Sequence, residues 1–395
     1  MPGGNTRLTV HVDPFPLYAR SGRGVFVTDV EGVERVDFLN NFGVLIHGHA
    51  HPKITEAICN AAAGGTSFGM PTPAEVELAE TICSRNGTFE RIRFCNSGTE
   101  AVMMAVQAAR AFTRRGRIAK CVGAYHGGYD SVAVGQSSLR DGQVVTLPGL
   151  SPAIAEHTVL IPFNDTDAAV AALLENKEDL AAVVVDPLPY RLDLVPAEPS
   201  YLSALREVCA AHEILFVADE VSSFRIGYHG ASAEFGIDAD VTVIGKVMGG
   251  GMPVGAVTGR SDVLAVFDPT GGEPLVPHAG AFNANAVTMA AGLASMTLLT
   301  QDAIGHVNSL GDEVRRGLEE VLRRRDLPWR VAGMGSFFRV HLPGREIATR
   351  LYGSLLSNGI VVAPNCSGSI STPMDRSHVA LLLSAFEKSL TELAV

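Results

Sequence analysis

The sequence predicts an α/β protein in which a mainly parallel sheet is covered by helices on both faces. Short apolar runs alternate with amphipathic stretches through the middle of the chain, and polar residues directly follow several of those runs. Of the 395 residues, 47% are hydrophobic and 18% are charged. Alternating strands and helices are typical of layered α/β folds, and a chain of this length can bury the cores of two domains or lobes.

The strands and helices expected in the middle of the chain follow from this alternation. In chain order they are a strand over 91–97, helices over 98–116 and 167–180, a strand over 181–187, a helix over 201–212, and strands over 214–221 and 240–246. In parallel sheets, ligands collect at the carboxyl ends of the strands. Four polar residues lie at those ends and are candidate site residues: Ser97, Asp186, Asp219 and Lys246.

The two ends of the chain differ from its middle. Residues 1–40 contain short strand-like pieces separated by Pro and Gly turns, whereas residues 285–395 contain long amphipathic helices and few apolar strands. We therefore expect a large domain over 41–284 and a smaller α+β domain built from both ends.

Composition and charge exclude several classes of protein. The net charge is −11, from 31 basic and 42 acidic residues, which argues against a nucleic-acid partner. The six cysteines include no CxxC pair, so neither a disulfide framework nor a zinc site is expected. No apolar run approaches the ~18 residues that cross a membrane, and the N-terminal residues lack a signal pattern. We expect a cytoplasmic protein.

The stretch DVTVIGKVMGGGMPVGA, residues 240–256, places Lys246 between an apolar strand and three glycines. Such a lysine is either a solvated cation of a loop or an amine that points into a site. The glycines match neither a phosphate-binding GxxxxGK[ST] loop nor a GxGxxG turn, so they indicate close approach of the backbone to a ligand or a partner chain.

Two further strand ends carry polar groups that could bind a ligand. NSGTEA, residues 96–101, places Ser-Gly-Thr where a strand turns into a helix, which forms either an anion site or an ordinary N-cap. VADEV, residues 217–221, ends a strand in two carboxylates, which must pair with a cation if they are buried. A structural ion pair, magnesium or a cationic ring nitrogen would each satisfy Asp219.

Aromatic and histidine side chains lie on two glycine-rich segments. GAYHGGYD, residues 123–130, presents an aromatic ring that either stacks on a flat ligand or packs within its loop. HGHAHP, residues 47–52, could bring three histidines to one side of an extended segment, but no carboxylate or cysteine accompanies them. We therefore expect no metal site.

These signals fit one cofactor when they are combined. Pyridoxal 5′-phosphate needs an amine for its aldehyde, a carboxylate for its ring nitrogen, an anion pocket for its phosphate and a stacked aromatic ring. Lys246, Asp219, the turn at Ser97 and the aromatic Tyr125 supply these groups in one chain. The combination predicts a pyridoxal-phosphate enzyme.

Several motifs also resemble those of one enzyme family. FCNSGTEAVMMA, AYHGGYD, VADEV, TVIGKVMGGGMPVGA and GAFNANAVTMAAG are similar to segments of class III pyridoxal-phosphate aminotransferases of fold type I. Within that family, the chain resembles the glutamate-1-semialdehyde aminomutase branch and the β-phenylalanine aminotransferases. The resemblance covers nearly the whole chain and implies a homodimer that acts on an amine or amino acid and a keto-acid acceptor.

The resemblance also implies roles for individual residues. Lys246 would be the Schiff-base lysine and the base that moves the proton, and Asp219 would pair with the ring nitrogen. Arg7 would receive the substrate carboxylate. The other cofactor-binding positions that the resemblance implies are Ser97, Gly98 and Thr99 at the phosphate, Tyr125 and Val221 on the ring faces, Asn164 near the ring hydroxyl, and His126.

Three positions depart from the family pattern. Ala281 stands where the family has a threonine at the partner subunit's phosphate, Asp186 replaces a glutamate, and Asn365 stands where β-phenylalanine aminotransferases have a second arginine. The sequence predicts an aminotransferase that acts on a β- or other non-α-amino acid. The alternatives are an intramolecular aminomutase, a racemase or decarboxylase, and a protein that binds the cofactor without catalysis.

Overall fold

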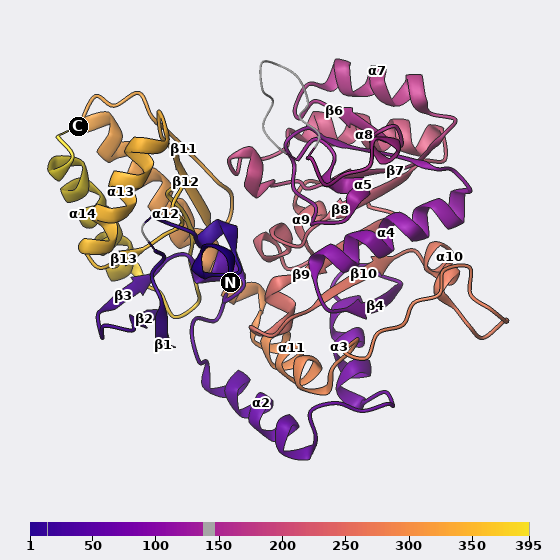
Figure 1. The fold of residues 1–395 in the computed structure, drawn as a ribbon, viewed down its shortest axis with the longest axis horizontal. Helices are drawn as coiled ribbons and strands as arrows, with labels where there is room; N and C mark the ends of the chain where they lie inside the picture. The colour runs from indigo at the N-terminus through magenta and orange to yellow at the C-terminus, as the bar shows by residue number, and fades with distance from the viewer. Residues whose placement is uncertain (14, 137–146, 395) are drawn as a thin grey trace. The chain divides into compact units, whose positions relative to one another are not determined.

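The computed structural model describes residues 1–13, 15–136 and 147–394 (Figure 1). The chain forms two compact units, one of Glu56–Leu299 and one of Met1–Thr55 with Thr300–Val395. The division expected from the sequence, with a large domain over 41–284, stays a prediction. In the part of the chain that is described, no helix is long and apolar enough to cross a bilayer.

The larger unit contains a seven-stranded sheet. From one edge to the other its strands are β4 (Arg91–Cys95), β10 (Gly255–Gly259), β9 (Val241–Gly245), β8 (Leu215–Asp219), β7 (Leu180–Val185), β5 (Arg117–Cys121) and β6 (Thr158–Ile161). The pairs β9–β8, β8–β7, β7–β5 and β5–β6 are parallel, whereas β10 runs antiparallel to both of its neighbours. This mainly parallel sheet confirms the α/β fold predicted from the sequence.

Alternate residues of the central strands pack into two different hydrophobic clusters. In β8, Leu215 and Val217 join one cluster, whereas Phe216 and Ala218 join the other. Side chains of a strand alternate between the two faces of a sheet, so both faces of this sheet are buried. The continuous apolar runs in the sequence reflect this burial on both sides.

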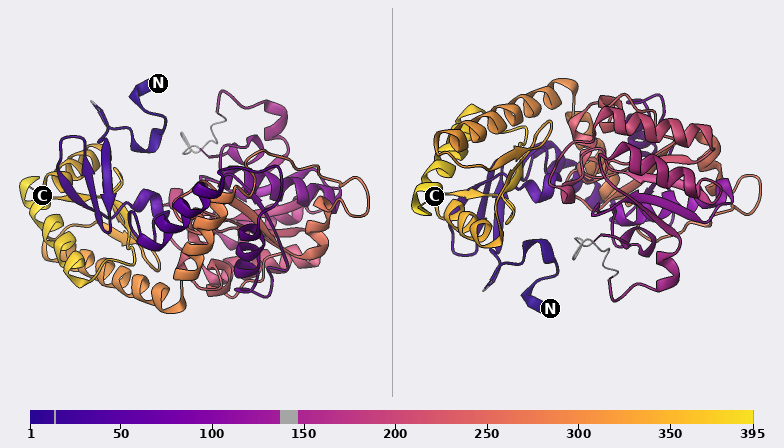
Figure 2. Two further views of the ribbon diagram at one scale, coloured as in Figure 1. Left: turned by 90° about the horizontal axis from the view of Figure 1, so that it is seen from below. Right: turned by 90° about the horizontal axis from the view of Figure 1, so that it is seen from above.

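Helices cover both faces of this sheet (Figures 1 and 2). The side chains of α4 belong to the first cluster, and those of α7 and α8 belong to the second. The helices of this unit are α3 (Pro73–Cys83), α4 (Gly98–Thr113), α5 (Asp130–Ala133), α6 (Pro152–Ala155), α7 (Thr166–Asn176), α8 (Pro199–Ala211), α9 (Ala231–Glu234), α10 (Ser261–Leu264) and α11 (Ala286–Leu298). Helix α2 (Pro52–Gly64) includes the division between the units.

The smaller unit joins the two ends of the chain, and Figure 2 shows its indigo N-terminal strands beside the yellow C-terminal helices. One sheet has the order β1 (Ala19–Arg23), β2 (Phe26–Asp29), β3 (Glu34–Asp37), β13 (Ile360–Val361), and another has the order β11 (Arg330–Ala332), β12 (Phe337–His341), β14 (Ser367–Ser369). Its helices are α1 (Asn40–Gly43), α12 (Gln301–Arg324), α13 (Arg345–Ser357) and α14 (Arg376–Glu392). Strand β13 pairs in parallel with β3, so residues more than 300 positions apart share one sheet.

Candidate active site

Lys246 lies immediately after β9, where the sequence analysis placed it. Its backbone has a φ of 47°, which is the left-handed region that non-glycine residues rarely adopt. Strained backbone of this kind is concentrated at functional sites. The Lys246 Nζ donates a hydrogen bond to the hydroxyl of Ser222, which follows β8 by three residues. The amine is therefore held at the carboxyl end of the sheet.

Asp219 is the last residue of β8 and is 4% exposed. Its Oδ2 lies 2.7 Å from His126 Nδ1, and its Oδ1 accepts a hydrogen bond from the backbone N–H of Val221 at 3.0 Å. Burial lowers the pKa of His126, and the Asp219 carboxylate opposes that shift. The His126 Nε2 is buried and has no hydrogen-bond partner among the described residues.

Ser97, Gly98 and Thr99 form the amino terminus of α4. Ser97 is the N-cap, and its hydroxyl accepts a hydrogen bond from the backbone N–H of Glu100 at 3.1 Å. A Cβ on Gly98 would lie 2.8 Å from the side chain of Val221, so only glycine permits this approach. The amino terminus of a 16-residue helix favours an anion.

The loop that carries Tyr125 and His126 is anchored at both ends. Lys120 is fully buried at the end of β5 and donates hydrogen bonds to the carbonyls of Ala124 at 2.8 Å and Val134 at 3.0 Å. Burial lowers the pKa of Lys120 to about 8. Farther along the loop, the Gly128 N–H donates to the Thr99 hydroxyl at 3.3 Å. These bonds hold the loop beside the first turn of α4.

Tyr125 is 48% exposed on this loop, and the Arg191 guanidinium lies over its ring at 5.1 Å. A cation can occupy one face of an aromatic ring while the opposite face stays available for stacking. The predicted stacking of Tyr125 on a flat ligand is compatible with this contact.

Asp186 follows β7 and is a second buried carboxyl group in the site. Its Oδ1 accepts hydrogen bonds from the Leu188 N–H at 2.9 Å and the Ser223 hydroxyl at 3.1 Å. Burial and the charge of Asp219 raise the pKa of Asp186 to about 8, although these two hydrogen bonds and the charge of Lys246 act to lower it. The neutral form of Asp186 is therefore favoured at pH 7.

Asn164 has both ends of its amide bonded to a neighbouring loop. Its Nδ2 donates to the Pro196 carbonyl at 3.1 Å, and its Oδ1 accepts from the Glu198 N–H at 2.9 Å. These bonds fix the segment after β7, and the predicted role of Asn164 near a ring hydroxyl stays a prediction.

Arg7 lies in the smaller unit, where its Nη1 donates a hydrogen bond to Asn41 Oδ1 at 2.7 Å and its guanidinium lies 5.2 Å from the centre of the Phe42 ring. These contacts orient an exposed cation. The contact of Arg7 with a substrate carboxylate stays a prediction.

The sequence analysis missed two residues that the structure brings into this region, Ser222 and Lys120. Ser222 directly follows the VADEV motif, so its position after a strand was an available signal. Lys120 interrupts the apolar run IAKCV, and a lysine inside a buried strand was a second signal.

Two histidines of the HGHAHP segment contact polar side chains of the smaller unit. His49 Nε2 is 2.7 Å from Asp37 Oδ2, and His47 Nδ1 is 3.3 Å from the Thr372 hydroxyl. The described residues contain no group of three or more side chains that could hold a metal ion.

The residues of the larger unit fit the predicted cofactor. Val221 can approach Gly98 closely because glycine has no side chain. Gly98 also lies at a helix amino terminus, which suits a phosphate. Asp219 is buried beside a histidine whose lowered pKa favours the neutral ring, which leaves the carboxylate charge for a cationic ring nitrogen. An amine, a buried carboxylate and an anion site thus follow the ends of β9, β8 and β4.

Comparisons with known proteins agree with this geometry. A profile of the family "Aminotransferase class-III" matches residues 8–374. The chain is 37% identical over 384 residues to a glutamate-1-semialdehyde 2,1-aminomutase of Ignicoccus hospitalis, covering 92% of this chain and 89% of that protein.

Two solved structures share the fold over almost the whole chain. A transaminase with PLP bound has a TM-score of 0.97 at 49% identity, covering 99% of this chain and 94% of its own. A β-phenylalanine aminotransferase of Variovorax paradoxus has a TM-score of 0.92 at 32% identity, covering 99% and 91%. The chain therefore belongs to the class III aminotransferase family, and it is an enzyme whose cofactor is pyridoxal 5′-phosphate.

Proposed function

We propose that this enzyme transfers an amino group on a carboxylate substrate whose amine is not at the α-carbon. The observation that carries the proposal is the amine of Lys246 held by Ser222 after β9, beside the strand that ends in the Asp219–His126 pair. A covalent anchor and a buried carboxylate on adjacent strands are the two groups that pyridoxal-phosphate chemistry demands of a protein.

Lys246 has two roles in this proposal. When bound, the cofactor supplies an electron sink for the negative charge that develops on the substrate carbon. Lys246 anchors the cofactor in the resting enzyme, and its Nζ then moves a proton at the substrate carbon. The Ser222 hydroxyl orients Nζ for that transfer, because it accepts the hydrogen bond that Nζ donates.

Asp219, His126 and Asp186 are buried groups of the candidate site, and they have different charges in this proposal. The carboxylate of Asp219 holds the positive charge of the ring nitrogen, and the His126 N–H fixes the orientation of that carboxylate. Burial lowers the pKa of His126 and raises that of Asp186, which favours the neutral form of both groups. We propose that Asp219 carries the charge that pairs with the ring cation. A single anion suits a single ring cation, because unpaired buried charges are costly.

The phosphate and the substrate carboxylate take separate anion sites in this proposal. The first turn of α4, with Ser97, Gly98 and Thr99, binds the phosphate. Arg7 binds the substrate carboxylate through a charge-assisted hydrogen bond. We also propose that the enzyme works as a homodimer.

The proposed amino-group transfer has two candidate forms, an intramolecular aminomutation and an intermolecular transamination. The name of the Ignicoccus relative describes an amino group moved between carbons 2 and 1 of one skeleton, and this supports an intramolecular aminomutase more strongly than the β-amino-acid transaminase that the sequence analysis put first. The intermolecular reaction is favoured by the names of the two solved relatives, a transaminase and a β-phenylalanine aminotransferase. An aminomutase needs no keto-acid acceptor, whereas a transaminase does.

One pair of incubations separates these forms. Purified enzyme is given glutamate-1-semialdehyde alone, and separately β-phenylalanine with and without a keto acid, and products are followed by chromatography. Isomerisation without an acceptor supports the aminomutase, and strict dependence on the keto acid supports the transaminase. Inactivity with every non-α amine tested, in an enzyme that turns over α-amino acids, contradicts the proposal.

A further inference from the structure

Lys120 of β5 is a buried cation beside the loop that carries Tyr125 and His126. Its side chain is 0% exposed, and among the described residues it forms no hydrogen bond or ion pair with a carboxylate. Burial lowers its pKa to about 8, so the ammonium form predominates at pH 7. A methionine of similar volume would avoid the cost of burying an unpaired charge. The lysine therefore indicates a role beyond packing.

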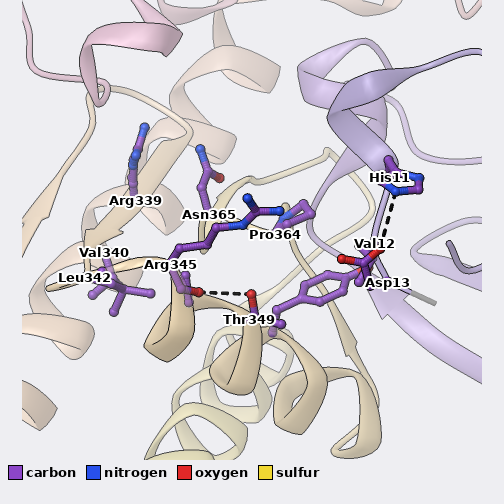
Figure 3. A pocket seen from close by; sticks show the side chains of 13 residues that line it. His11, Val12, Asp13, Arg339, Val340, Leu342, Arg345, Thr349, Pro364 and Asn365 are labelled. Atoms are coloured by element: carbon purple, nitrogen blue, oxygen red, sulfur yellow. Dashed lines mark hydrogen bonds and ion pairs between the residues drawn. The ribbon is translucent and has the colours of Figure 1, made fainter. Parts of the chain in front are cut away.

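The position of Lys120 excludes direct contact with a ligand. A cavity of about 590 Å³ in the smaller unit is lined by the N-terminal segment, β12, α13 and the loop at Pro364 (Figure 3). Two cavities of the larger unit, of about 410 and 530 Å³, lie beside β4 and beside the start of β8. Lys120 lines none of these three and has no exposed surface. Any effect of Lys120 on a bound molecule must pass through other residues.

The two carbonyls that accept from the Lys120 Nζ lie at the two ends of the loop. Ala124, at 2.8 Å, directly precedes the predicted cofactor-binding residues, and Val134, at 3.0 Å, is the C-cap of α5. A backbone hydrogen bond of 2.7 Å from the Gly123 N–H to the Gly135 carbonyl joins the same two ends. The ammonium and this backbone bond together close the base of the loop.

The middle of the same loop contacts the first turn of α4. The Gly128 N–H donates to the Thr99 hydroxyl at 3.3 Å. A Cβ on Gly127 would lie 2.6 Å from the Thr99 hydroxyl oxygen, and the φ of 98° at Gly127 also favours glycine. The loop is thus held by Lys120 at its base and by close backbone packing against the predicted phosphate turn.

The charge of Lys120 also acts on His126. Burial is the main cause that lowers the pKa of His126, the Asp219 carboxylate opposes it, and the Lys120 ammonium acts in the same direction as burial. A neutral histidine has one N–H, and His126 Nδ1 lies 2.7 Å from Asp219 Oδ2. The neutral ring that donates from Nδ1 leaves the negative charge on Asp219.

We propose that Lys120 is a positioning residue of the cofactor site. Its ammonium holds the two ends of the loop, which fixes the His126 ring against Asp219 and orients Tyr125, and Lys120 itself touches neither cofactor nor substrate. This inference rests on the proposed pairing of Asp219 with the ring nitrogen.

Lys120→Met in the cofactor-loaded enzyme tests this inference, because methionine fills a similar volume without the charge or the donors. We expect kcat to fall at least about tenfold while KM stays within about threefold, since the loop orients the cofactor and not the substrate. Release of the cofactor on dilution, followed by visible absorption, should be at least about tenfold faster. The control Lys388→Met removes an exposed lysine of α14 and should stay within about twofold of the wild type in both measurements.

A double-mutant cycle with Asp219→Asn separates positioning from a general structural role. If Lys120 acts through the His126–Asp219 pair, adding Lys120→Met to Asp219→Asn should lower kcat by less than about threefold, because the pair is already disabled. A structural role acts independently and repeats its full loss in the Asp219→Asn background. Near-wild-type turnover of Asp219→Asn alone would refute the proposed function, and the inference with it. A severe loss in Asp219→Asn with an undiminished effect of Lys120→Met refutes the inference alone.

A second variant covers any loss of folding in Lys120→Met. Lys120→Gln keeps two N–H donors on a shorter, uncharged side chain, so its kcat and its rate of cofactor release should lie between those of the wild type and those expected for Lys120→Met. Thermal unfolding of each loaded enzyme reports whether it is folded. The inference is overturned if a folded Lys120→Met or Lys120→Gln has the kcat and cofactor release of the wild type, or if Lys388→Met causes the same losses.

Discussion

His126 Nδ1 lies 2.7 Å from Asp219 Oδ2, and the two side chains are almost completely buried although they are 93 positions apart in the chain. The loop after β5 delivers the histidine, and the last residue of β8 delivers the carboxylate. Neither side chain could be buried at low cost without the other, because an unpaired buried carboxylate is strongly destabilising.

Replacement of Asp219 by asparagine should leave a folded but severely impaired enzyme. The amide can still accept the hydrogen bond from Val221, but it carries no charge to pair with the ring nitrogen. Loss of one partner of a buried charge pair costs about 3–5 kcal/mol, and about 1.4 kcal/mol is tenfold in rate. We expect kcat to fall by ~10²–10³-fold, with the exposed Asp238→Asn as control. Turnover near that of the wild type would refute the role of Asp219.

Replacement of Lys246 by alanine should abolish both turnover and the covalent attachment of the cofactor. The visible absorption of the bound cofactor should change, and borohydride reduction followed by peptide mapping should label Lys246 in the wild type. Lys120 is the informative alternative, because it is also buried and burial lowers its pKa to about 8. A label on Lys120 or on any other lysine is incompatible with the assignment.

Replacement of Asp186 by asparagine should change how stability depends on pH. The pKa of Asp186 is raised to about 8 in the folded state, above the 3.8 of an unperturbed carboxyl. The folded protein therefore binds a proton that the unfolded chain releases, so this group lowers the free energy of unfolding as pH rises from about 4 to about 8.

The stability difference between Asp186→Asn and the wild type should grow across that window by up to about 1.4 kcal/mol per pH unit and level off above pH 8. Urea unfolding of both proteins between pH 5 and pH 9 measures this difference. A difference independent of pH would show that Asp186 is ionised throughout the range.

Replacement of Arg7 by alanine should raise KM for the carboxylate substrate while kcat changes little. In the proposal Arg7 forms a charge-assisted hydrogen bond whose loss affects binding before chemistry. Losing an ionic contact of this kind costs about 2–5 kcal/mol where the site is desolvated. Arg20→Ala, another exposed arginine of the same unit, is the control. Equal KM values in wild type and Arg7→Ala would remove Arg7 from the site.

Replacement of Ala281 by threonine tests the proposed dimer together with its phosphate site. We predict that the segments GGGMPVG, residues 249–255, and GAFNANA, residues 280–286, lie at a two-fold interface, so light scattering should show a dimer. If Ala281 faces the partner's phosphate, a threonine hydroxyl should tighten cofactor binding by about 0.5–1.5 kcal/mol, the net value of one hydrogen bond. An active monomer, or unchanged cofactor affinity in the variant, would argue against this position.

The site in the larger unit could be predicted from the sequence to a large degree, because its residues follow strands. Lys246, Asp219 and Ser97 lie at or just after the ends of apolar runs, and in a mainly parallel sheet such strand ends are where ligands collect. The helix cap at Ser97 was also a local signal, since capping depends on neighbouring residues.

Other features depend on which strands are neighbours. The order β4-β10-β9-β8-β7-β5-β6 differs from chain order and places Asp186 near the charges of Asp219 and Lys246. The surroundings of Asp186 in the folded chain raise its pKa, and apolar periodicity in the sequence does not record the burial of a single carboxyl group beside another charge.

The sequence by itself therefore determined the alternation of strands and helices, the positions of the polar residues at strand ends, and the kind of cofactor they suit. These properties rest on local periodicity and on the chemistry of single side chains. Only the tertiary structure decided the pairing of His126 with Asp219 and the anchoring of the loop by Lys120. Each of these joins residues from separate elements, so its energy depends on packing that forms only when the chain folds.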